Sequence, residues 1–94
     1  MIKPISKKKL EAASRILKAV SHPDRLAIVN GLMQNECNVG EIQTRLSLPQ
    51  STVSQHLRIL RDAGIIRGRQ DKNRRCYRVV NDLARAMVLH IRKD

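Results

Sequence analysis

The sequence predicts a single, mainly α-helical domain with a small β-hairpin near its carboxyl end. Apolar residues recur at steps of three and four along five segments, which is the spacing of amphipathic helices. Two of those segments are short and almost contiguous. Two β-prone runs, at residues 65–70 and 76–80, flank a polar Asp-Lys-Asn turn and predict the hairpin. The 94 residues are expected to form one domain, residues 1–94.

The first two helices are expected at residues 7–20 and from residue 23 to about residue 34. In the second helix, Pro23 suits the first turn and Asp24 complements the positive helix amino end. A polar connector follows. Residues 37–39 are too few to classify by periodicity, and a brief strand is expected there.

The next two helices are expected at residues 39–46 and 51–63. Pro49 stops the earlier one, because the residue before a proline avoids helical backbone angles, and Gly64 suits the cap of the later one. Two short helices joined by a tight turn form a helix-turn-helix, whose second helix lies in the major groove of DNA.

The exposed side of that second helix carries short or forked hydrogen-bonding side chains, where an ordinary solvated helix would more often carry Glu and Lys. Glutamine can read adenine and arginine can read guanine by paired hydrogen bonds, while serine and threonine reach bases or phosphates. The candidate DNA-binding residues of this helix are Gln50, Ser51, Thr52, Ser54, Gln55 and Arg58.

The hairpin is strongly basic, and a helix-turn-helix followed by a basic hairpin is a winged helix-turn-helix. Its cations can meet phosphates or enter the minor groove, unless they only protect an edge hairpin from aggregation. The hairpin candidates are Arg67, Arg69, Lys72, Arg74 and Arg75. A fifth helix follows, capped by Asn81 or Asp82.

The net charge is the strongest compositional signal: 19 Lys and Arg against 8 Asp and Glu give a formal charge of +11, which indicates a polyanionic partner. Tyr77 is the only aromatic residue, so the stacking platform of proteins that bind single strands is missing and double-stranded DNA is favoured. A sequence-independent architectural or RNA-binding protein is the alternative. The sequence has no cluster of residues typical of a catalytic site, so an enzyme is not expected. No membrane span and no cofactor are expected either. A cytoplasmic location is expected.

Three motifs, in order and at the right separations, resemble the ArsR/SmtB family of bacterial winged-helix repressors: "SHPDRL", "STVSQHLRILRDAG" and a hairpin ending in "CYRVV". The likeness covers residues 16–80. It implies a homodimer joined through the first and last helices, bound to an inverted-repeat operator near a promoter and released by an effector. The dimer-interface candidates, which could instead complete the monomer core, are Leu10, Leu17, Leu83, Met87 and Ile91.

The effector is left open by the resemblance. Many metal sensors of this family carry two cysteines at the start of the third helix, where this chain has Asn38 and Gly40, so no metal site is expected. A metal-responsive repressor with a non-standard site stays an alternative.

The two cysteines, Cys37 and Cys76, are a redox or disulfide candidate. In winged helices, the segment before the third helix usually pairs with the second hairpin strand, which would make them neighbours. Thiol oxidation or persulfide formation would then release the repressor. The alternatives are two unrelated, small buried cysteines, another effector or none.

Overall fold

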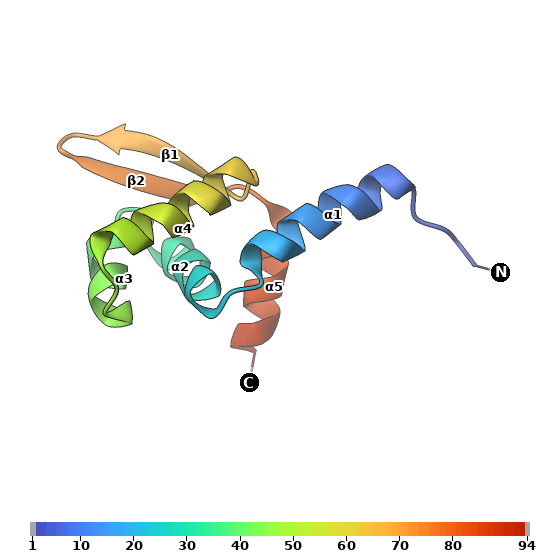
Figure 1. Ribbon diagram of the computed structural model, residues 1–94, viewed down its shortest axis with the longest axis horizontal. Coiled ribbons are helices and arrows are strands. Elements are labelled where there is room, and N and C mark those ends of the chain that lie inside the picture. The colour runs from blue at the N-terminus through green and yellow to red at the C-terminus, as the bar shows by residue number, and fades with distance from the viewer. Residues whose placement is uncertain (1, 94) are drawn as a thin grey trace.

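The computed structural model describes residues 2–93, which form five helices and one two-stranded antiparallel sheet (Figure 1). The elements are α1 (Lys7–Val20), α2 (Pro23–Gln34), α3 (Val39–Leu46), α4 (Gln50–Asp62), β1 (Ile66–Asp71), β2 (Arg74–Val79) and α5 (Asp82–Arg92). The winged helix-turn-helix order is confirmed. No helix within residues 2–93 is long and apolar enough to cross a membrane.

One expected element is not formed. Residues 36 and 37 lie in a turn, so the brief strand predicted at residues 37–39 is wrong. The segment still touches the hairpin, because the Tyr77 amide donates a hydrogen bond to the Glu36 carbonyl at 2.8 Å. A single backbone hydrogen bond aligns the two segments without making a strand.

Local signals in the sequence explain most of the helix ends. The His22 imidazole accepts from the Asp24 amide at 3.0 Å ahead of Pro23, and Asn81 caps α5 by accepting from the Ala84 amide at 2.9 Å. After α4, Gly64 has φ +79°, a backbone angle that glycine adopts without strain. The capping roles expected for Asn81 and Gly64 are therefore confirmed.

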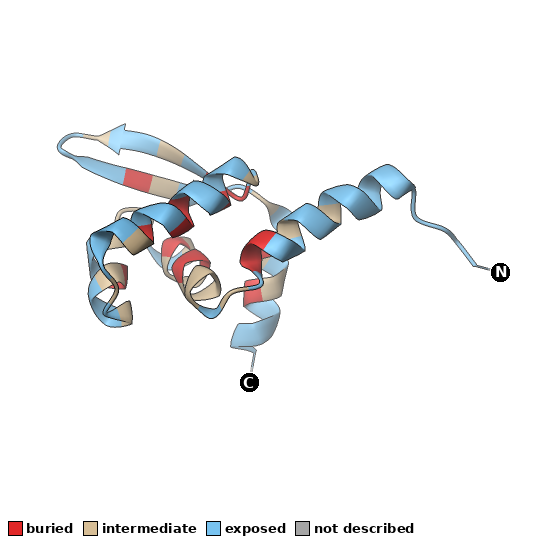
Figure 2. Ribbon diagram, viewed as in Figure 1, coloured by how far each residue is buried: buried red, intermediate tan, exposed pale blue. Residues whose placement is uncertain are grey.

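The core surrounds α2, which contacts each of the other four helices and strand β2. Figure 2 shows the buried positions gathered on α2 and on its neighbours. The largest fully buried side chains are Ile28, Val29, Leu32, Leu60, Ile65 and Cys76. Helices α2 and α3 approach so closely at Gly31 that an added Cβ atom would lie 2.6 Å from Ile42 Cδ1.

The outer helices leave apolar surface uncovered. Helix α1 extends away from the rest of the molecule (Figure 1), and Leu10 and Leu17 are 52% and 42% exposed. In α5, Ala84 and Val88 face the core while Ile91 is 62% exposed. These leucine and isoleucine side chains do not complete the monomer core. The remaining two interface candidates, Leu83 and Met87, are partly buried.

The hairpin pairs Ile66 with Val79 at its base and Asp71 with Arg74 at its tip, so Lys72 and Asn73 form a two-residue turn. Lys72 has φ 57°. Strand β2 begins two residues earlier than expected, and the expected turn residue Asp71 belongs to β1. The hairpin lies along α4, with its tip toward the end of the molecule where α4 begins (Figure 1).

Candidate nucleic-acid interface

Helix α4 separates a buried side from a polar exposed side. Its buried side chains are Val53, His56, Leu57 and Leu60. The predicted DNA-binding residues Gln50, Ser51, Ser54, Gln55 and Arg58 are all exposed, and Thr52 is partly buried. No side chain caps the amino end of α4, which leaves first-turn amides available to a phosphate.

A histidine cluster on the buried side attaches α4 to the start of α2. Arg25 donates to His56 Nδ1 at 3.3 Å, and the rings of His22 and His56 lie 4.7 Å apart. Burial lowers the pKa of His56; the electrostatic influence of His22 and Arg25 adds to this effect, and the carboxylate of Asp24 opposes it. Burial thus favours the neutral form of His56. The sequence reasoning missed this cluster because His56 lies 31 residues from Arg25 in the chain.

The cluster also resembles a metal site, because ligand atoms of His22, Asp24 and His56 lie within 4.8 Å of one another. However, Nδ1 of His56 accepts from Arg25 and Nδ1 of His22 accepts from the Asp24 amide. Both Nδ1 lone pairs are therefore already engaged in hydrogen bonds and are not free for an ion. The arrangement supports a structural attachment between α2 and α4.

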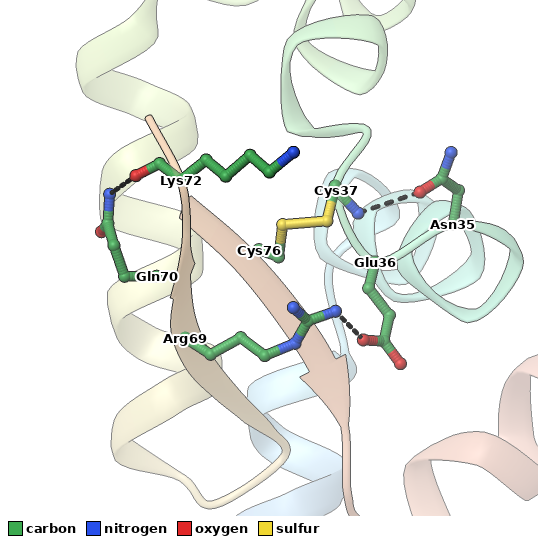
Figure 3. Close-up of a disulfide and its surroundings, with 7 residues drawn as sticks. All are labelled: Asn35, Glu36, Cys37, Arg69, Gln70, Lys72 and Cys76. Atoms are coloured by element: carbon green, nitrogen blue, oxygen red, sulfur yellow. Dashed lines mark hydrogen bonds and ion pairs between the residues drawn. A yellow bond between two sulfur atoms is a disulfide. The ribbon is translucent and has the colours of Figure 1, made fainter. Parts of the chain in front are cut away.

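The cations of the wing, residues 66–79, differ in what they contact. Arg67, Lys72, Arg74 and Arg75 are exposed, and the Arg75 guanidinium lies 5.9 Å from the centre of the Tyr77 ring. Arg69 instead forms an ion pair with Glu36 at 2.8 Å (Figure 3), and this hydrogen bond raises the pKa of Arg69. Arg69 is thus tied to the body of the domain.

Cys37 and Cys76 form a disulfide with a Cα–Cα distance of 4.3 Å (Figure 3). The expectation that they are neighbours is confirmed, and the alternative of two unrelated cysteines is wrong. The disulfide joins the turn before α3 to the middle of β2. The turn is itself ordered, because Asn35 Oδ1 accepts from the Cys37 amide at 3.0 Å. The sequence reasoning missed Glu36, the other residue of this turn that contacts the wing.

A helix-turn-helix that exposes Ser, Gln and Arg on its second helix, followed by a basic hairpin, defines a winged helix-turn-helix DNA-binding protein. Comparison with known proteins identifies the family. The model of the arsR family of bacterial regulatory proteins matches residues 22–67. A biofilm growth-associated repressor of Agrobacterium fabrum is 35% identical over 85 residues, which are 90% of this chain and 73% of the repressor. The chain belongs to the ArsR family and is a DNA-binding transcriptional regulator.

Solved structures agree over nearly the whole fold. HlyU from Vibrio cholerae superposes with a TM-score of 0.83 at 35% identity, covering 92% of this chain and 94% of HlyU. A structure described as reduced HlyU gives 0.82 at 35% identity, covering 90% of each chain. A homodimeric winged helix-turn-helix DNA-binding domain from Mycobacterium bovis gives 0.76 at 26% identity, covering 97% of this chain and 87% of that domain.

Proposed function

We propose that the chain is a homodimeric, non-enzymatic repressor that binds an inverted-repeat operator in double-stranded DNA, with an affinity set by the redox state of Cys37 and Cys76. One observation carries the redox part of this proposal. The disulfide joins the segment that leads into the helix-turn-helix directly to the wing. The helix-turn-helix and the wing are the two parts of the fold that would contact DNA.

The exposed residues of α4 would contact base edges and the exposed cations of the wing would contact phosphates or the minor groove. A bidentate side chain on a base contributes about 1–3 kcal/mol of discrimination, whereas a phosphate contact strengthens binding to every sequence. We assign the first role to Gln55, which is exposed on α4, and the second to Lys72 at the hairpin tip.

Dimerisation is supported by the apolar surface on α1 and α5 and by the homodimeric relative from Mycobacterium bovis. A helix such as α1, with Leu10 and Leu17 exposed, gains hydrophobic stabilisation when a second copy covers it. Two recognition helices about 34 Å apart would then meet successive major grooves on one face of the operator. Repression would follow from occlusion of the promoter.

The sign of the redox effect follows from the freedom of the wing. The disulfide, the Glu36–Arg69 ion pair and the Tyr77–Glu36 hydrogen bond hold the wing in one orientation. Binding by a pre-organised surface avoids an ordering cost, which is about 1–2 kcal/mol for each backbone residue. We expect reduction to weaken operator binding about tenfold, which corresponds to about 1.4 kcal/mol. This is the opposite of the sequence-based expectation, in which oxidation releases the repressor from DNA. A relative, HlyU from Vibrio cholerae, has a structure described as reduced, which supports a role for oxidation state in the proposal.

Operator binding measured in competition with random DNA tests the proposal. Gln55→Ala should lower affinity for the operator by about 1–3 kcal/mol more than for random DNA, whereas Lys72→Ala should weaken both and reduce the salt slope by about one. Equal losses on both DNAs for Gln55→Ala would contradict the recognition role of α4. A wild type that shows no specificity ratio would favour the architectural alternative.

The same titration in the presence of a metal chelator, with oxidised and reduced wild type and with Cys37→Ser under both conditions, tests the redox switch. The wild type should respond to reduction and the variant should not. Tighter binding by the reduced wild type would mean that the disulfide holds the wing in a non-binding orientation. Identical affinities in the two states would remove the switch. Sedimentation of the complex should give two chains per operator.

A further inference from the structure

A carboxylate lies beside the two sulfur atoms of the disulfide. One oxygen of Asp71 and the Sγ atoms of Cys37 and Cys76 all lie within 4.8 Å of one another. The register explains this position: Arg69 pairs with Cys76, so Asp71, two residues further along β1, points to the same face of the hairpin. Three side chains from three chain segments therefore converge on one point.

We propose that in the reduced protein Cys37, Cys76 and Asp71 bind one zinc ion. Thiolates and carboxylates are zinc ligands, with Zn–S distances of about 2.3 Å and Zn–O distances of about 2.0–2.2 Å. In a tetrahedron with these bond lengths, the ligand atoms lie roughly 3.5–3.8 Å apart. The Asp71 oxygen lies within 4.8 Å of both sulfur atoms, close to this spacing. The two sulfur atoms are bonded in the oxidised protein and must move apart by about 1.7 Å once the bond is broken. A water molecule would complete the tetrahedron.

The charges around this point favour the site. Assembling two thiolates and a carboxylate brings three negative charges together, which is costly without neighbouring positive charge. The hairpin supplies it: Arg74 is the cross-strand partner of Asp71, and Arg69 lies two residues before Asp71 on the same face. Two soft thiolates also favour zinc over magnesium or calcium, which prefer oxygen ligands. In the histidine cluster, by contrast, both Nδ1 lone pairs are already engaged in hydrogen bonds.

The zinc-bound state and the disulfide exclude each other. A low-molecular-weight thiol reduces the disulfide through a mixed disulfide: two thiol molecules supply two electrons and two protons and leave as their own disulfide, and Cys37 and Cys76 become thiols. Zinc then forms two Zn–S bonds and one Zn–O bond, and the two thiol protons pass to solvent. The ion joins the same two segments that the disulfide joins. With zinc bound, the wing would thus stay attached to the helix-turn-helix under reducing conditions, and the loss of operator affinity expected on reduction applies to the zinc-free protein.

Cobalt titration of the reduced protein, followed by displacement with zinc, tests the site, because cobalt bound to thiolates gives a charge-transfer absorption band. We expect one ion per chain in the reduced wild type, no band in the oxidised protein and none in Cys37→Ser. Asp71→Asn should weaken zinc binding about tenfold or more. Asp82→Asn, at a carboxylate that is 96% exposed on α5, is the matched control and should bind like the wild type.

Three results would overturn the proposal: no charge-transfer band in the reduced wild type, an unchanged band in Cys37→Ser, or equal zinc affinity for Asp71→Asn and the wild type. His22→Asn keeps a residue able to cap α2 and should leave binding unchanged. Zinc lost only in this variant would place the ion at the histidine cluster. A measurement without variants is the rate at which the reduced wild type is reoxidised, which zinc should slow because it engages both thiolates. None of these readouts involves DNA, so the zinc site and the redox switch can fail separately.

Discussion

Reducing the Cys37–Cys76 disulfide should lower the free energy of unfolding by about 4 kcal/mol. The two cysteines are separated by 39 positions in the sequence. In the chain-entropy description, a crosslink stabilises mainly by restricting the unfolded chain, by about 3 kcal/mol for a 15-residue loop and about 4.7 kcal/mol for a 100-residue loop. A loop of this length falls between those values. Four kcal/mol is a large part of the about 5–15 kcal/mol that stabilises a typical domain.

Urea unfolding followed by circular dichroism measures this difference on the wild type with and without a thiol reductant, at one protein concentration and with a metal chelator. The concentration must be fixed because association stabilises the folded state by mass action. The chelator prevents zinc from replacing the disulfide. Cys37→Ser, which has no disulfide in either condition, is the control and should unfold at the same urea concentration with and without reductant.

A difference below about 1 kcal/mol would refute the reasoning, because it would mean that the unfolded chain is already restricted without the crosslink or that the crosslink strains the folded state. A similar redox difference in Cys37→Ser would show that the reductant acts elsewhere. The expected pattern would also establish that the wing and the α3 turn are held together by a covalent bond whose loss is felt by the whole domain.

Three further predictions concern the stability of the domain. Gly31→Ala should destabilise the domain by about 1 kcal/mol or more, because the added Cβ atom would lie 2.6 Å from Ile42 Cδ1. Gly40→Ala should stabilise the domain by about 0.5–1 kcal/mol, because no atom lies within 4 Å of the added Cβ atom. Urea unfolding measures both changes. The pKa of His56 is lowered from 6.5 in the folded protein. The contribution of His56 to stability is therefore complete when the pH is above its pKa in the unfolded chain, and it is lost as the pH falls through its pKa in the folded protein. The urea concentration at the midpoint of unfolding should therefore decrease as the pH is lowered from about 7.5 to about 5, and it should decrease less in His56→Gln. An equal decrease in the two proteins would contradict this contribution of His56.

Much of the fold followed from local rules. Apolar spacing located the five helices, and Pro49 and Gly64 marked where the helices of the helix-turn-helix end, because backbone restrictions act within a few residues. The exposed polar face of α4 was also readable, since its periodicity separates it from the buried side. The predicted strand at residues 37–39 failed because pairing with the hairpin depends on the path of the whole chain, and that path provides only one backbone hydrogen bond.

The sequence by itself determined the order of elements, the basic wing and the family, because motif, charge and periodicity are properties of neighbouring residues. Only the tertiary structure decided how side chains from distant segments meet. It joined Cys37 to Cys76, paired Glu36 with Arg69 and placed Asp71 beside the sulfur atoms. Such distances depend on how the helices pack around α2 and on the register of the hairpin, and no local pattern encodes either. The cysteine that stands before α3 thus acquires its partner, and its proposed role, from the fold.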